Sequence, residues 1–277
     1  MGNELMRDVH AFTPNDGEMA FWWLGQLGYI VKTKRAVLCF DPYLRPDDNR
    51  LVPPLVTPEE LTGIDYIFGS HDHIDHIDRY AWERIAESSP KTCFVLPEAL
   101  VESIGSDLKI DSKRLIGLDE GRVFNDAEKG MRVSAIASAH EFLSRDAVTD
   151  LYDCIGFVVD IEQLRIYHSG DNCKYEGLET KLMTLRPIDL MFLPINGRDA
   201  ERYSSGCIGN MNFAEAVDLA GTVAPGLIVP GHYDMFSNNS EDPLRFMQYL
   251  AVKYPGQRAW VGGHGQRIML SNIPETR

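Results

Sequence analysis

The chain has 277 residues, 44% of them hydrophobic, and is long enough to bury one large core. Its formal net charge is -14, and no block of lysine or arginine interrupts the acidic composition. Such a charge balance argues against a nucleic-acid-binding protein and against attachment to an anionic membrane surface. We therefore expect a single domain over residues 1–277, with neither nucleic acid nor membrane as a partner.

The 5 cysteines are scattered along the chain without any C-x-x-C spacing. An odd number of scattered cysteines indicates reduced thiols in a reducing compartment. The first residues contain no apolar run long enough for a signal peptide, and no later stretch approaches the length of a membrane span. These observations predict a cytoplasmic protein.

In chain order, the first part of the sequence predicts two early strands and a long loop. The strands are apolar runs at residues 19–32 and 36–40, and the second ends at Asp41. The residues from there to Gly63 are rich in proline and charge, which indicates a loop. A short buried strand at residues 64–68 then leads into a highly polar turn.

After this turn, helices and strands alternate. Asp78 can cap a helix over residues 79–87. Further strands are expected over residues 92–96, 115–118, 122–125, 132–137, 155–161, 165–168, 190–193, 226–229 and 259–261. Further helices are expected over residues 97–104, 178–185, 212–222 and 243–253. This order, in two similar halves, favours an α/β fold in which two sheets pack face to face and helices cover both outer faces.

The polar turn at residues 69–78 reads GSHDHIDHID. Three of the 8 histidines of the chain, His71, His73 and His76, lie here together with Asp75. Imidazole and carboxylate groups suit zinc, manganese or iron better than magnesium or calcium, and such close spacing can serve two adjacent ions. The turn therefore predicts metal-assisted hydrolysis rather than a solvated surface turn.

Three further candidates also follow predicted strands. They are His140, Asp171 and His232. Taken alone, a histidine after a strand is usually a capping or core residue, and an aspartate after glycine usually forms a turn. The first cluster, however, cannot complete the coordination of two ions, so further ligands must come from elsewhere in the chain. These three side chains are the candidates for them. We therefore predict one shared site at the strand ends.

At this point the motifs resemble the metallo-β-lactamase fold superfamily of metal-dependent hydrolases. The family's H-x-H-x-D-H pattern begins here at His71. More narrowly, FWWLG at residues 21–25, YHSGD at residues 167–171 and HYDMFSN at residues 232–238 look like the L-ascorbate 6-phosphate lactonase branch. The resemblance spans nearly the whole chain. It implies a four-layer αββα sandwich with the metal site at one edge, where the sheets meet.

The resemblance also implies two divalent metal ions, zinc or manganese. The implied ligands are His71, His73 and His140 for one ion, Asp75, His76 and His232 for the other, and Asp171 as a bridge. Asp41 matches the family's early aspartate, which supports a ligand histidine rather than binding metal. Relatives commonly assemble, so a homo-oligomer is compatible with the resemblance.

Such a site predicts hydrolysis of an ester or lactone. Water held between two cations loses a proton near neutral pH, and the resulting hydroxide can attack a carbonyl carbon. Asp75 or Asp171 could hold this water and accept its proton. The expected substrate is a small acidic or phosphorylated sugar-derived lactone. Substrate contacts are expected from Asn196, from Arg198, which can clamp a phosphate or carboxylate, and from His264 in a glycine-rich turn.

Two other functions stay open at this point. His140 is typical of phosphodiesterase-like members of the superfamily rather than of the lactonases, and two-metal sites also favour phosphoryl displacement. A metal-dependent phosphodiesterase is therefore the alternative. The second alternative, from another functional class, is a non-catalytic metal-binding sensor or scaffold whose hydrolytic site is unused.

Overall fold

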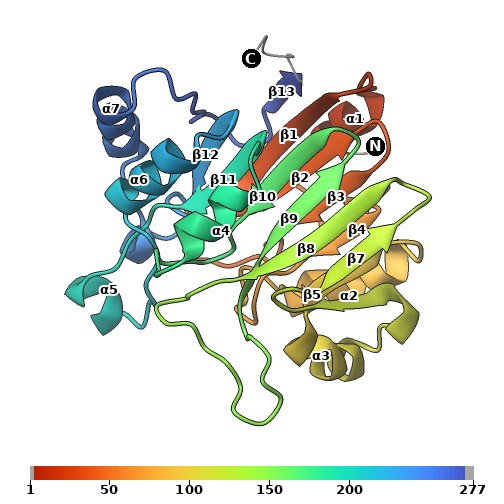
Figure 1. Cartoon of the computed structure of the whole chain (residues 1–277). Helices are drawn as coiled ribbons and strands as arrows, with labels where there is room; N and C mark the ends of the chain where they lie inside the picture. Colours follow the sequence, from red (N-terminus) through yellow and green to blue (C-terminus); the bar gives the residue numbers. More distant parts are fainter. Residues whose placement is uncertain (1–2, 272–277) are drawn as a thin grey trace.

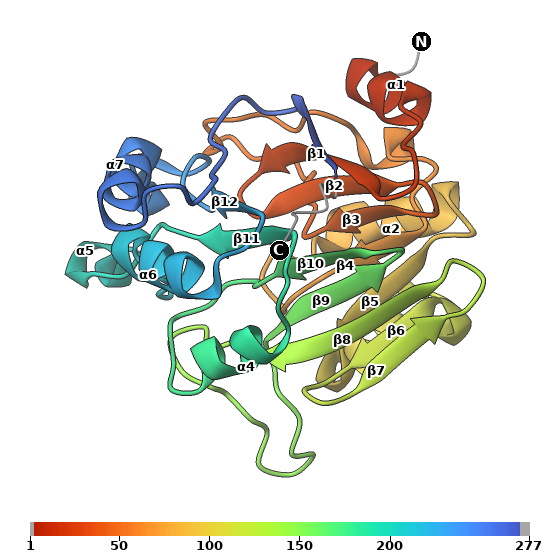
Figure 2. The same ribbon diagram turned by 45° about the horizontal axis from the view of Figure 1, so that its top comes forward.

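The computed structural model describes residues 3–271. Within them, a seven-stranded and a six-stranded β-sheet lie face to face, with helices on the outer side of each sheet (Figures 1 and 2). The predicted four-layer αββα sandwich is confirmed by this arrangement. Its two sheets position the residues of the candidate site, because those residues follow the strands.

The seven-stranded sheet contains β1 (Glu18–Gly25), β2 (Gly28–Thr33), β3 (Val37–Phe40), β4 (Tyr66–Phe68), β5 (Cys93–Pro97), β6 (Leu115–Leu118) and β13 (Arg267–Ser271). Its order is β13-β1-β2-β3-β4-β5-β6. The first four strands in this order pair antiparallel, whereas β3 to β6 run parallel. Because β3 and β4 are parallel neighbours, Asp41 and the histidine-rich turn that follow them lie at the same edge.

The six-stranded sheet contains β7 (Val123–Asp126), β8 (Met131–Ala137), β9 (Ile155–Ile161), β10 (Leu164–His168), β11 (Leu190–Pro194) and β12 (Leu227–Gly231). Its order is β12-β11-β10-β9-β8-β7. β10, β11 and β12 are parallel, and β8 and β10 both run antiparallel to β9 between them. β8, β10 and β12 therefore end at one edge, which brings His140, Asp171 and His232 to the same side.

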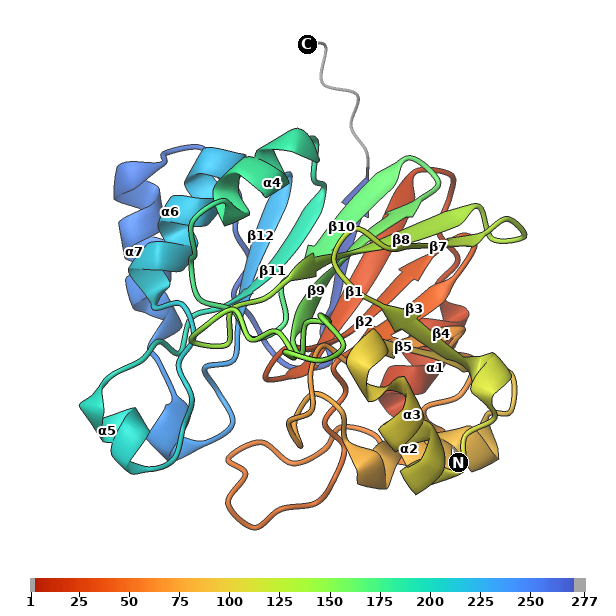
Figure 3. The same cartoon turned by 60° about the horizontal axis from the view of Figure 1, so that its bottom comes forward.

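Helices cover the outer faces of both sheets, as Figure 3 shows from another side. On the side of the seven-stranded sheet lie α1 (Glu4–Ala11), α2 (Arg79–Ser88) and α3 (Val101–Leu108). On the other side lie α4 (Leu178–Thr184), α5 (Ala200–Ser204), α6 (Phe213–Val223) and α7 (Pro243–Lys253). Single 3-10 turns occur at Pro58–Glu60, Glu98–Leu100, Ser112–Arg114 and Ser237–Asn239. Among residues 3–271, none of the helices combines the length and apolar character that a membrane crossing requires.

Strand β1 shows how the sequence builds the layers. Successive side chains of a strand point to opposite faces of the sheet. Phe21 and Trp23 point between the two sheets, where the Phe21 ring meets Phe192 edge to face with centroids 5.7 Å apart. Trp22 points to the other face, where it packs against Phe12 beside α1. Both tryptophans are buried. Because they point to opposite faces of the sheet, they belong to two different hydrophobic cores.

Two of the predicted strands differ from the structure, and two of its helices lie outside the prediction. The predicted strand over residues 19–32 is two strands, because the chain turns back at Gln26 and Leu27. The predicted strand at 259–261 is wrong: Ala259 forms one isolated bridge with β12, and two glycines follow at residues 262 and 263. The helices α1 and α5, which are only 8 and 5 residues long, were not predicted.

The expectation of two similar halves also fails at the C-terminal end. The last strand, β13, was not predicted, because it is a sheet edge whose residues are mostly exposed or half-exposed. It pairs with β1 and therefore belongs to the sheet that is otherwise made by the first half of the chain.

Candidate metal centre

The seven implied metal ligands gather at one edge of the sandwich. Four of them lie in the turn after β4, and the other three follow β8, β10 and β12. The turn is held by its own backbone, since the amide of Ile77 donates to the carbonyl of His73 at 2.9 Å. Ile77 is fully buried beneath the turn, and Asp78 accepts from an amide of the first turn of α2. The histidines are therefore mounted between a strand end and a helix start.

The first group of donor atoms consists of three imidazole nitrogens. Nε2 of His71 lies 3.0 Å from Nδ1 of His73, which in turn lies 3.2 Å from Nε2 of His140. Lone pairs of neutral imidazoles repel at such distances unless a cation or a proton lies between them. Two nitrogens bound to tetrahedral zinc at about 2.0–2.1 Å are separated by about 3.3 Å, so this spacing fits a bound ion.

The second group combines Asp75, His76 and His232. Nε2 of His232 lies 3.3 Å from Oδ2 of Asp75, and Nε2 of His76 lies 3.7 Å from the same oxygen. The two histidine rings stack with an interplanar angle of 18°. Two imidazoles and a carboxylate are a donor set that zinc, manganese and iron accept.

Asp171 lies between the two groups. Its Oδ1 is 3.4 Å from Nε2 of His76, and its Oδ2 is 3.3 Å from Nε2 of His232 and 3.6 Å from Nε2 of His140. Oδ1 of Asp171 and Nε2 of His76 are both buried and have no hydrogen-bond partner among residues 3–271. Unsatisfied buried polar atoms are costly, and a divalent cation would satisfy both. The residues therefore fit bound metal, and Asp171 lies within reach of ligands in both groups.

Asp41 contacts His76 and Ser70 beside the donor groups. Its Oδ2 accepts from Nδ1 of His76 at 2.6 Å and from the hydroxyl of Ser70 at 2.7 Å. Its Oδ1 accepts from the backbone amide of Ser70 at 2.8 Å. A proton on Nδ1 leaves the lone pair of His76 on Nε2, the atom that faces Asp171. The carbonyl of Gly209, 3.2 Å from Nδ1 of His140, can fix that ring in the same way.

The charges of the site divide its histidines into two kinds. Burial lowers the pKa of His71, His73 and His140, which keeps these rings neutral and able to bind metal. Burial also opposes the charged form of His232, but the carboxylates of Asp171 and Asp75 outweigh it and raise the pKa of this ring to about 10. In the absence of cations, the two carboxylates thus favour positive charge at this ring.

Backbone strain is concentrated around the site. Of the non-glycine residues with positive φ, Gln26, Asp41, Glu141 and His232 lie in or beside it, with φ values of 51°, 38°, 73° and 59°. Such conformations cost free energy for residues with a Cβ and persist where the surrounding structure requires them. His232 directly follows β12, so its left-handed backbone turns the ring toward the other ligands.

A polar cavity of about 710 Å³ opens beside the second group. Its lining residues include Asp75, Gln26, Cys207, Asn238 and Asn239. Among residues 3–271, no lysine or arginine lines this cavity. A substrate that enters it therefore meets amides, a thiol and a carboxylate rather than cations.

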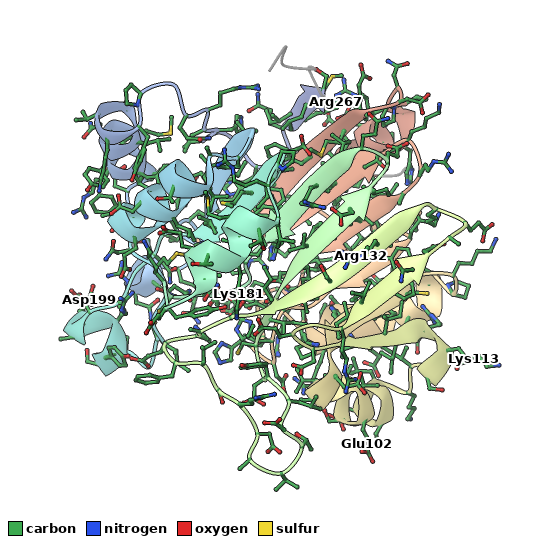
Figure 4. The ribbon with its side chains drawn as sticks, in the orientation of Figure 1. Glu102, Lys113, Arg132, Lys181, Asp199 and Arg267 are labelled. Carbon is green, nitrogen blue, oxygen red and sulfur yellow. The ribbon has the colours of Figure 1, made fainter. Side chains whose placement is uncertain are left out.

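Three cationic side chains of the outer surface pair with carboxylates away from the cavity. Figure 4 labels Arg132, Lys181 and Arg267 on the outside of the molecule. They pair with Asp160, Glu120 and Asp8 at 3.4, 2.5 and 3.1 Å. Pairing of this kind between exposed groups contributes little free energy, but it keeps these side chains at the surface.

Two of the predicted substrate residues, Arg198 and Asn196, bond to other residues of the protein and do not line the cavity. The guanidinium of Arg198 makes a two-pronged contact with Glu215 at 2.7 and 2.8 Å and also donates to a backbone carbonyl. Glu215 is the residue that closes the capping box of α6. Asn196 is fully buried and donates to Asn239, which lines the cavity, at 2.8 Å. The structure therefore gives both side chains partners within the protein.

The third predicted substrate residue, His264, stacks on Trp23 with ring centroids 4.1 Å apart. Its Nε2 lies 2.6 Å from Oδ2 of Asp234. The other oxygen of Asp234 accepts from the backbone amide of Gln26 at 3.0 Å. His264 is thus linked to the site through Asp234 and Gln26 rather than through the cavity.

Sequence reasoning missed Gln26, Ser70 and Asp234 as residues of the site. Ser70 has a signal, since it precedes the histidine pattern directly, where a hydroxyl can reach the first ligand. Gln26 and Asp234 have no local signal for their contact, because they are 208 positions apart in the sequence. Only the folded chain shows their contact.

Comparison with known proteins yields relatives over most of the chain. A UPF0173 metal-dependent hydrolase of Caldivirga maquilingensis is 26% identical over 254 residues, which cover 90% of this chain and 96% of the relative. A second UPF0173 metal-dependent hydrolase, from Thermococcus onnurineus, is 28% identical over 233 residues and covers 83% of this chain and 92% of its own length.

Among solved structures, a metallo hydrolase from Ignicoccus hospitalis has the same fold, with a TM-score of 0.68 and 16% identity, covering 92% of this chain and 99% of that one. Residues 37–233 match the family described as Beta-lactamase superfamily domain. This match contains the histidine-rich turn and ends just after His232. The chain therefore belongs to the beta-lactamase superfamily.

Proposed function

We propose that this protein is a metal-dependent hydrolase that opens a small sugar-derived lactone. The observation that carries the proposal is the convergence of seven His and Asp side chains into two donor groups beside an open polar cavity. The relatives named metal-dependent hydrolases support the broader part of the proposal, hydrolysis with a metal. The lactone is the finer part, and it depends on the resemblance of the sequence motifs.

Two divalent ions, zinc or manganese, would occupy the two donor groups. His71, His73 and His140 would hold one ion, and Asp75, His76 and His232 the other. When bound, such ions lower the pKa of water and polarise a carbonyl oxygen. Asp171, which reaches both groups, would hold the pair together.

We assign different roles to the two carboxylates because their exposure differs. The Asp75 side chain is 15% exposed and lines the cavity, so it can meet substrate and water. Its Oδ2 is already engaged by Gln26. Oδ1 is therefore the atom that we expect to accept a proton from the attacking water. The Asp171 side chain is only 4% exposed, which suits a bridge and not a proton acceptor open to the cavity.

The cavity favours a neutral, hydroxyl-rich ring over a phosphorylated one. Asn238 and Asn239 can exchange hydrogen bonds with hydroxyl groups, and Phe236 adds an apolar surface. A phosphate bound outside the metal centre would require a further cation, and Arg198, the side chain expected to supply it, is bound to Glu215. We therefore expect sugar lactones without phosphate to be the better substrates.

The proposal is tested by adding zinc- or manganese-loaded protein to a panel of sugar lactones. The acid that ring opening produces is measured as the readout. Lactone turnover by the unmodified protein supports the proposal if an Asp171→Asn variant loses both the turnover and the bound metal. No ring opening on any lactone in the panel would overturn the finer part. The same panel includes an unphosphorylated and a phosphorylated form of one lactone, so that the expected preference is measured directly.

A metal-dependent phosphodiesterase is the second candidate. It is favoured by the position of His140, which completes the first donor group and lies 3.6 Å from Asp171. Two donor groups on either side of a carboxylate suit in-line displacement at phosphorus. Hydrolysis of bis(p-nitrophenyl) phosphate without lactone turnover would select this candidate. Metal binding without either activity would instead favour a sensor or scaffold.

A cytoplasmic location is also proposed. All five cysteines are free thiols in the structure, which suits a reducing compartment. Fractionation of cells followed by immunoblotting would test it. Light scattering of the purified protein would test the homo-oligomer, which stays a prediction.

A further inference from the structure

The side chain of Gln26 connects the turn between β1 and β2 to the second donor group. Its Nε2 donates to Oδ2 of Asp75 at 3.0 Å. The same nitrogen lies 3.5 Å from both ring nitrogens of His232. Gln26 is 1% exposed, so this contact lies in the interior where hydrogen bonds to a charge are strong. One amide group thus contacts two of the three side chains in the second group.

The backbone of Gln26 is held in an unfavourable conformation. Its φ is 51°, in the left-handed region that glycine adopts at little cost. Gly25 and Gly28 flank the same turn, so a third glycine would be compatible with its backbone. A strained residue with a long polar side chain indicates that the side chain, and not the turn, determines the residue at this position.

Several contacts keep Gln26 in place. Its carbonyl accepts from the backbone amide of His232 at 2.9 Å and from the indole of Trp23 at 3.0 Å. Its amide donates to Oδ1 of Asp234 at 3.0 Å, and the other oxygen of Asp234 pairs with His264 at 2.6 Å. His264 in turn stacks on Trp23. The position of Gln26 is therefore fixed from both of its backbone polar groups.

We propose that Gln26 is a positioning residue for the second metal-binding group. It fixes Oδ2 of Asp75 beside His232, so that these ligands are arranged before an ion binds. Asp75 is the most exposed of the carboxylates in the site, and without this donor its side chain would be free to rotate into the cavity. Gln26 acts through Asp75 and not on the reacting atoms.

The first donor group provides an internal comparison, because it is positioned by other residues. His71 contacts the hydroxyl of Ser70, and His140 contacts the carbonyl of Gly209. Loss of the Gln26 side chain should therefore weaken metal binding by the second donor group and leave metal binding by the first group unchanged. The inference depends on the metal centre of the proposed function but not on the lactone, since it concerns metal affinity alone.

The experiment measures zinc affinity by competition with a chromophoric chelator. Gln26→Gly is placed in a His140→Ala background, which retains the second group, and in an Asp75→Ala background, which lacks the partner of Gln26. Residues that support metal ligands typically change affinity by about 10–100-fold. We expect a loss of that size in the first background and no further change in the second.

Two further measurements separate positioning from folding. Gln26→Gly relieves the strained φ, so its metal-free melting temperature should stay close to that of the unmodified chain even while zinc affinity falls. Gln26→Met retains the length of the side chain but not the donor, and should lose affinity to the same extent. The inference is overturned if both variants bind zinc like the parent, if the loss persists without Asp75, or if the His140→Ala parent binds no zinc. Failure of lactone hydrolysis would leave these measurements unchanged.

Discussion

His76 and Asp41 form a fully buried pair in which Nδ1 of the histidine lies 2.6 Å from Oδ2 of the aspartate. Because Asp41 also accepts the amide and hydroxyl of Ser70, one carboxylate connects the end of β3, the start of the histidine-rich turn and a ligand ring. This relationship determines which nitrogen of His76 remains available to bind an ion.

Asp41→Ala should therefore impair both metal binding and folding. The buried amide of Ser70 and Nδ1 of His76 would lose their acceptor, at a cost of about 1–3 kcal/mol for each unsatisfied group. Zinc affinity should fall by about 10–100-fold, as is typical when a supporting carboxylate is removed. Chemical denaturation and chelator competition measure the two effects. An unaltered zinc affinity would exclude the supporting role of Asp41.

Asp171→Ala should have a larger effect on metal content than any supporting residue. The carboxylate lies within 3.6 Å of ligands in both groups, so its removal affects both sites at once. Elemental analysis should find about two ions per chain in the parent protein and fewer in the variant, with loss of the hydrolytic activity. Two fully retained ions would show that Asp171 is not the bridge.

Removal of metal should destabilise the protein. A ligand present at about 100–1,000 times its Kd adds about 2.7–4.1 kcal/mol to the stability of the state that binds it. For a chain of this size, chelation should lower the melting temperature by about 5–15 °C. The Asp171→Ala variant is the control, since it should respond less. Equal melting curves with and without chelator would contradict a metal centre that holds the two sheets together.

Arg198→Ala should reduce stability without affecting substrate affinity. Its ion pair with Glu215 is about one-third exposed, so we expect a loss of about 1 kcal/mol from that pair and the hydrogen bond to Asn210. Arg132→Ala, which removes another arginine paired with a carboxylate, serves as the matched control. KM should be unchanged in both. A tenfold or greater rise in KM in Arg198→Ala alone would restore the role expected from the sequence.

The stability of the fold should depend on pH through Asp126, a carboxylate remote from the metal ligands. The hydroxyl of Tyr66 donates to Oδ2 of Asp126 at 2.5 Å. Slight burial opposes the charge of Asp126, but Tyr66 and two backbone amides outweigh it and lower the pKa of the carboxyl below its ordinary 3.8. A lowered pKa adds stability above the unfolded-state value, and this stability is lost as the pH falls through the folded-state value.

The comparison of the unmodified chain with Tyr66→Phe isolates this contribution. The difference in unfolding free energy should be less than about 1 kcal/mol near pH 7, because Asp126 is largely solvated, and should shrink below about pH 4. Urea titrations of the metal-free proteins at both pH values measure it. A difference that grows on acidification would reverse the assigned sign.

The parts of the site that could be predicted from the sequence are those with local signals. His71 and His73 stand two positions apart after a buried strand, and their chemistry is evident from that spacing alone. His232 required the additional step that parallel strands end at one edge, which the sheet order bears out. Gln26 could not be found, since its role depends on contacts with residues 49 and 208 positions away.

The fold shows the same division. Long apolar runs predicted the central strands well, because burial on both faces leaves a strong pattern. The edge strand β13 has only one buried residue, Leu270, and its identity as a strand comes from pairing with β1. Residues 259–261 have the stronger apolar pattern but pair with β12 at a single position.

The pairing of β13 with β1 has a consequence for the order of events during synthesis. β13 follows every other strand of the described chain, so β1 has no neighbour on that side until residues 267–271 leave the ribosome. His264 precedes this strand and secures Asp234, which holds the amide of Gln26. All seven side chains of the two donor groups and Asp171 are thus made before the segment that fixes their surroundings. A nascent chain would pass through a stage in which it can capture metal loosely, and docking of the final strand would tighten that hold.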